Sequence, residues 1–79
     1  MFTKEQFPAG TIFVYVDGGY NEHIYLCESR GETDSFGTGT LYIKSYIVCP
    51  AADTTIKVGQ EFSLEVKRIK QICYTPPKE

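Results

Sequence analysis

The residues of this chain that could take part in catalysis are few. His23 is the single histidine. A nucleophilic mechanism built on histidine needs a serine or cysteine within hydrogen-bond reach and a carboxylate that orients the ring. The nearest cysteine, Cys27, lies four residues further along an expected strand, which is about 13 Å at the spacing of β-structure. The sequence therefore predicts no enzyme and assigns no catalytic residue.

Metal and phosphate motifs are equally weak. The three cysteines, Cys27, Cys49 and Cys73, are odd in number, form no CxxC pair and each sit in or at the end of an apolar run, so we expect buried free thiols. The acidic residues of 28–34 do not have the spacing of a calcium loop. The glycine-rich segment 37–40 precedes an expected strand and lacks the lysine of a phosphate loop. We therefore expect no metal and no cofactor.

Aromatic and basic residues are the better candidates, and they indicate binding. The chain contains six tyrosines and five phenylalanines but no tryptophan, and tyrosine combines an apolar body with a polar tip. One phenylalanine stands alone in a polar segment, two tyrosines share one face of an expected strand, and three cations gather near the C-terminus. The candidate binding residues are Phe36, Tyr42, Tyr46, Lys67, Arg68 and Lys70.

Two N-terminal strands are expected to form a hairpin. Segment 11–17 (TIFVYVD) is mostly β-branched or aromatic. In 22–28 (EHIYLCE), Ile24 and Leu26 point one way and His23, Tyr25 and Cys27 the other. The residues between them begin Asp17-Gly18-Gly19, a sequence that accepts positive φ in tight turns. Both faces of 11–17 are apolar, so we expect both to be covered. In so short a chain the second cover would be a barrel wall, a helix or another subunit.

The middle of the chain predicts a long loop and a third strand. Segment 29–39 is polar and holds three glycines, so we expect a loop that presents Phe36. Segment 40–49 (TLYIKSYIVC) alternates, with Leu41, Ile43, Ile47 and Cys49 on one face.

The C-terminal part alternates from residue 62, with Phe62, Leu64 and Val66 directed inward. Ile69 breaks this parity, and a bulge or bend near residues 67–68 would restore it. The same spacing also fits a short helix, but we favour strands.

The expected architecture is all-β. Residues 1–79 make a single small domain with a lead-in at 1–10 and a tail at 75–79. The pattern predicts a small antiparallel β-barrel or a strongly twisted sheet of four or five strands, because closure removes exposed edges.

One segment carries a resemblance to a known family. Residues 57–66 (KVGQEFSLEV) resemble the strand entry of S1-type oligonucleotide-binding barrels. The resemblance implies a barrel. If it extended to function, Lys67, Arg68 and Lys70 would meet phosphates while Tyr42 and Tyr46 stacked on bases. The net charge of −2 at pH 7 makes nucleic acid an unlikely partner.

Size and charge bear on assembly and location. A core of this size supplies only about 3–5 kcal/mol, which favours a homo-oligomer. Residues 1–55 hold three basic against seven acidic residues, and 56–79 hold five against three, an asymmetry suited to aligning a charged partner. The N-terminus lacks the pattern of a signal peptide and no run is long enough to span a membrane, so we expect a cytoplasmic protein.

Binding without catalysis is the leading hypothesis for function. In size and composition the chain is similar to small bacteriophage-encoded proteins that inhibit a host enzyme or a host defence, which predicts an inhibitor that blocks a host protein. A first alternative is a symmetric oligomer that sequesters a small anionic ligand, such as a nucleotide, between its subunits. Two further alternatives are a single-stranded nucleic-acid binder and a small virion or assembly component.

Overall fold

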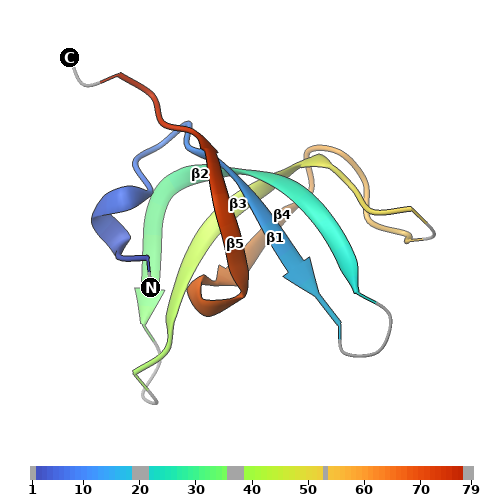
Figure 1. Ribbon diagram of the computed structural model, residues 1–79, viewed down its shortest axis with the longest axis horizontal. Helices are drawn as coiled ribbons and strands as arrows, with labels where there is room; N and C mark the ends of the chain where they lie inside the picture. The colour runs from blue at the N-terminus through green and yellow to red at the C-terminus, as the bar shows by residue number, and fades with distance from the viewer. Residues whose placement is uncertain (1, 19–21, 36–38, 53, 78–79) are drawn as a thin grey trace.

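Alternating apolar residues produce five strands and two short 3₁₀ turns in the computed structural model, which describes residues 2–18, 22–35, 39–52 and 54–77 (Figure 1). The elements in chain order are η1 (Lys4–Gln6), β1 (Ile12–Asp17), β2 (His23–Ser35), β3 (Leu41–Cys49), β4 (Glu61–Glu65), η2 (Val66–Arg68) and β5 (Ile69–Tyr74). In the described part of the chain no helix is long and apolar enough to cross a membrane.

The strands form one antiparallel sheet in the order β4-β3-β2-β1-β5, which confirms the all-β prediction. The sheet curls strongly without closing (Figure 1). Its two edges, β4 and β5, follow one another in the chain and are joined by η2. The bend expected at residues 67–68 is therefore present. The helical alternative for this segment is wrong beyond that turn, because β5 pairs with β1 at Phe13–Ile72 and Tyr15–Ile69.

The loop expected over 29–39 is wrong for residues 29–35, which continue β2. Thr33, Asp34 and Ser35 pair with β3 after a register shift. Gly31 has a φ of +80° just before this pairing resumes. The side chains of this stretch are polar and mostly exposed, yet the strand forms because β3 supplies its backbone hydrogen bonds.

The core lies on the concave inner face of the sheet. Odd-numbered residues of β1, β2 and β3 point inward, together with even-numbered residues of β4. The buried cluster consists of Phe7, Phe13, Tyr15, Tyr25, Cys27, Ile43, Ile47, Leu64, Val66 and Ile69.

The segment 1–10 is more than the lead-in that the sequence predicts, because Phe7 is part of the core and only 1% exposed. Its ring packs edge-on against Phe13 at 5.4 Å and against Phe2 at 5.9 Å between centroids. The Ser29 hydroxyl donates to the Phe7 carbonyl at 3.0 Å, and the Gly10 amide donates to the Ser29 carbonyl at 2.9 Å. These bonds fix the N-terminal segment to β2.

Only one cysteine is buried as the sequence predicts. Cys27 is 0% exposed, and burial raises the pKa of its thiol to about 12. Cys49 and Cys73 are exposed, so the expectation of a buried thiol is wrong for these two. Both lie close to the ends of their strands, β3 and β5. At a strand end, the alternation of residues does not predict whether other side chains bury the thiol.

Candidate functional site

The convex outer face of the sheet carries a row of side chains that crosses all five strands. In register order the row consists of Tyr74, Ile12, Glu28, Tyr46 and Glu61. Directly opposed residues in an antiparallel sheet have Cβ atoms about 4.5–5.5 Å apart. Tyr46, a predicted binding residue, therefore lies within a continuous surface and not on an isolated strand.

Apolar residues extend this row toward the β1–β2 hairpin. Val14 lies opposite Leu26, and Ile24 is 58% exposed. Tyr74 and Val48 are 53% and 37% exposed. The cover that we expected for both faces of β1 is thus incomplete in the described part of the chain. We call this surface the outer apolar face and define it by Ile12, Val14, Ile24, Leu26, Tyr46, Val48 and Tyr74.

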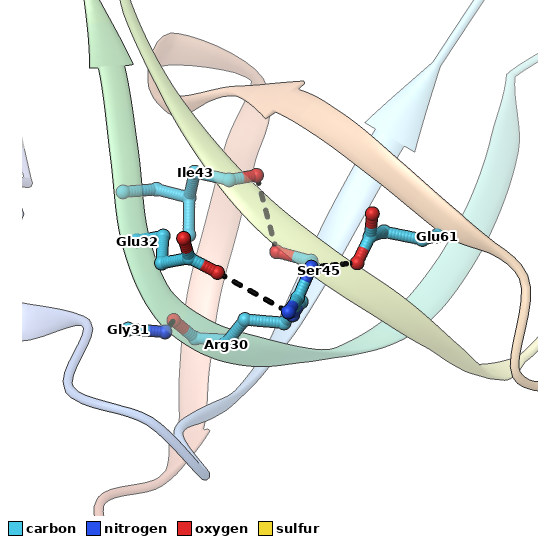
Figure 2. Close-up of polar contacts among 7 residues, drawn as sticks. Arg30, Gly31, Glu32, Ile43, Ser45 and Glu61 are labelled. Atoms are coloured by element: carbon cyan, nitrogen blue, oxygen red, sulfur yellow. Dashed lines mark hydrogen bonds and ion pairs between the residues drawn. The ribbon is translucent and has the colours of Figure 1, made fainter.

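Arg30 sets the charge at one border of this face. Its guanidinium pairs with Glu61 and lies 3.3 Å from Glu32 (Figure 2). The same group lies 5.4 Å from the centroid of the Tyr46 ring, within the range of a cation–π contact. Beneath it, buried Ser45 donates to the Ile43 carbonyl at 3.3 Å. Arg30 therefore holds the Tyr46 ring beside carboxylates.

The tyrosines and the cations predicted for binding do not form one continuous surface. Tyr42 lies opposite Glu65 in the β3–β4 register. Glu65 in turn lies 3.7 Å from the Lys67 ammonium and 3.6 Å from the Arg68 guanidinium. A carboxylate therefore stands between Tyr42 and these two cations.

The three predicted cations do gather around one depression. It has a volume of about 200 Å³ and is lined by Val16, Gly18, Glu22, Lys67, Arg68 and Lys70. Lys70 occupies the register shift between Val14 and Tyr15 in the β1–β5 pairing. The backbone irregularity thus places Lys70 beside the two cations of η2. Phe36, the remaining predicted site residue, lies outside the described residues.

A second pocket was missed by sequence reasoning. It has a volume of about 210 Å³ and is lined by Tyr15, Asp17, Tyr25, Ile47, Ile56, Phe62, Ser63 and Leu64. We call it the inner pocket, because most of these residues belong to the inner face of the sheet. Its residues come from four strands and the segment after β3, so no local motif identifies it. The available signal was the inward parity of Tyr15, Asp17 and Tyr25.

Comparison with protein-family models, with curated proteins and with solved structures finds no match for this chain. The turn before β4 has the form expected from the S1-like segment. Its Gln60 amide donates to the Lys57 carbonyl at 3.1 Å and Gly59 has a φ of +87°. This local likeness concerns the entry to a strand, so function has to be argued from the surfaces described above.

Proposed function

We propose that this chain is a non-enzymatic binding protein that docks on another protein through its outer apolar face. The exposed apolar side chains of that face carry the proposal, above all Ile24 and Tyr74. Contiguous exposed apolar residues on a small protein typically mark an interaction site. Because these residues sit on paired strands, little conformational entropy is lost on binding. A partner covered in this way would be blocked, which is the action of a phage-type inhibitor.

Charge favours a partner that differs from this chain. Glu28 lies inside the outer apolar face, between Ile12 and Tyr46. Covering its carboxylate requires a cation on the partner, since an unpaired buried charge is costly. Arg30, the cation beside the face, is already bound to Glu61 and Glu32. A second copy would bring another Glu28, and one cation that it offers in return is Lys44, two residues from Tyr46 on the same side of β3. The face therefore fits best a protein with its own lysine or arginine around an apolar centre, placed to meet Glu28.

The test compares two substitutions of exposed apolar residues. Ile24→Lys places a charge in the outer apolar face, whereas Val58→Lys is the control, because Val58 is 68% exposed in the segment before β4. We expect the wild-type chain and Val58→Lys to capture the same protein from the source cell lysate, and Ile24→Lys to lose it. Glu28→Lys should weaken the same complex at least tenfold.

Two results would overturn the proposal. One is capture that Ile24→Lys and Glu28→Lys leave unchanged. The other is a homodimer of the isolated wild-type chain, seen by native mass spectrometry under reducing conditions, that Ile24→Lys dissociates. That second result would mean that another copy of the chain covers the face.

A small anionic ligand is the second candidate, because Lys67, Arg68 and Lys70 surround one depression. Inorganic phosphate and a nucleoside monophosphate are suitable probes. The double substitution Lys67→Glu with Arg68→Glu should abolish binding, and Lys57→Glu is the control in a separate turn. Unchanged affinity in the double variant would exclude the site. The carboxylates beside Tyr42 and Tyr46 favour a small anion over a polynucleotide, which would need cations and aromatic rings along one path.

A further inference from the structure

We propose that the inner pocket binds a small organic cation, a protonated amine carried on an apolar or aromatic body. The pocket opens on the inner face, away from the outer apolar face. This inference therefore stands or falls independently of the proposed protein partner.

The walls of the pocket select an apolar body. Four of the eight lining residues, Ile47, Ile56, Phe62 and Leu64, are apolar, and Ile47 and Leu64 are only 3% and 7% exposed. The volume of about 210 Å³ exceeds the roughly 150 Å³ of an engineered cavity that holds benzene. One substituted six-membered ring therefore fits within the pocket.

The hydroxyl groups of two tyrosines indicate a ligand with polar character. Tyr15 and Tyr25 are 8% and 4% exposed, and their rings lie 6.5 Å apart between centroids. Neither hydroxyl has a hydrogen-bond partner among the described residues. Among the described residues, no buried side-chain oxygen or nitrogen lacks a hydrogen-bond partner. The two tyrosine hydroxyl oxygens, which have no such partner, are therefore not fully buried. Both residues line the inner pocket, so a ligand bound there contacts both tyrosines.

Asp17 determines the sign of the ligand charge. Asp17 lines the pocket, and its carboxylate has no ion-pair partner within 4 Å in the described part of the chain. His23 lies opposite it in the hairpin register, and Arg68, the cation that acts on Tyr15, is bound to Glu65. An ammonium group would pair with the free carboxylate, and a carboxylate or phosphate would be repelled by it.

The electrostatic state of Tyr15 fits a hydrogen-bonding role. Burial raises the pKa of its hydroxyl, and the nearby Asp17 carboxylate raises the pKa further. Tyr15 therefore stays protonated at neutral pH and keeps both its donor and its acceptor. The two tyrosines line the pocket, and aromatic rings attract cations that lie over their faces.

The test uses two probes of the same shape, phenethylammonium and 2-phenylethanol, titrated into the ¹⁵N-labelled protein and followed by NMR. We expect the ammonium to bind at least tenfold more tightly than the alcohol, with shift changes at Tyr15, Tyr25 and Leu64. Asp17→Asn should remove this preference while leaving the affinity for the alcohol unchanged. Asp34→Asn is the matched control, because Asp34 is a carboxylate on β2 outside the pocket.

Three results would refute the inference. The first is that neither probe binds at millimolar concentration. The second is that both probes bind with equal affinity. The third is that the Asp17→Asn variant still binds the ammonium more tightly than the alcohol. If Asp17→Asn failed to fold, the comparison of the two probes on the wild-type chain would still decide.

The ammonium group could belong to a free small amine or to a lysine side chain of another protein, since both share this chemistry. Nα-acetyl-lysine methylamide mimics a lysine side chain within a protein, and its titration distinguishes the two sources. A site for free amines binds phenethylammonium at least tenfold more tightly than this lysine mimic.

Discussion

Replacing Phe7 by alanine should unfold this chain at room temperature, although the sequence places Phe7 outside every strand. The side chain is 1% exposed and packs edge-on between Phe2 and Phe13. Removing a buried phenylalanine ring costs about 3–5 kcal/mol of folding free energy. A single core in a chain of this size supplies about the same amount, so little or no net stability remains.

A graded series keeps this prediction measurable by urea unfolding. Phe7→Leu retains most of the buried area and should cost about 1–2 kcal/mol. With an m-value of about 1 kcal/mol/M, the midpoint falls by roughly 1–2 M. Val58→Ala is the control, because Val58 is 68% exposed, and it should shift the free energy of unfolding by no more than about 0.5 kcal/mol. A Phe7→Ala variant that unfolds cooperatively with a midpoint within about 0.5 M of wild type would refute the assignment of Phe7 to the core.

Three further predictions concern backbone space, thiol access and pH. Gly31→Ala should lower the melting temperature more than Gly59→Ala. Both glycines have positive φ, so both substitutions strain the backbone. A Cβ at Gly31 would also lie 2.9 Å from the Ala9 amide nitrogen, whereas a Cβ at Gly59 meets nothing within 4 Å. A thiol reagent such as DTNB should modify Cys49 and Cys73 rapidly in the folded protein and Cys27 only in denaturant, and three fast thiols would contradict the burial of Cys27. Burial raises the pKa of Cys27 from 9.0 to about 12, so the folded state holds this proton more tightly than the unfolded state. That contribution to stability is complete below pH 9 and is lost as pH rises to about 12, by up to about 1.4 kcal/mol per pH unit. A Cys27→Ala variant should lose less stability over that range, and equal losses would argue against the shift.

Local sequence patterns were sufficient to place all five strands, although not the full length of β2. Segments 11–17 and 40–49 form β1 and β3 nearly to the residue, because both are rich in β-branched and aromatic side chains. The parity change at Ile69 located η2, since a strand that ends one face and begins another has to turn between them.

The failures have a common physical cause, which is long-range pairing. Residues 29–35 look like a loop from composition, but their partner is β3, and the hydrogen bonds of a ladder do not depend on side-chain polarity. Phe7 packs its ring against Phe13, and Ser29, 22 positions away, donates to its carbonyl. The inner pocket likewise depends on which strand ends meet, information that local periodicity does not contain. Of the predicted site residues, Lys67, Arg68 and Lys70 come together because a bend and a register shift happen to face the same depression.

The two sheet edges differ in charge, and this limits how copies of the chain could polymerise. Glu61 and Glu65 lie on β4, whereas Lys70 lies on β5 next to the cations of η2. Within one copy Glu61 is paired with Arg30, and Glu65 with Lys67 and Arg68, so contact between β4 of one copy and β5 of the next would exchange such ion pairs for pairs between copies. Such a heterologous contact cannot close into a two-fold pair, and it generates a ring if the rotation between copies closes and an open, head-to-tail filament if it does not. Its attraction is screened as ionic strength rises, so added salt should disperse any fibrous material that concentrated, low-salt solutions of this protein deposit.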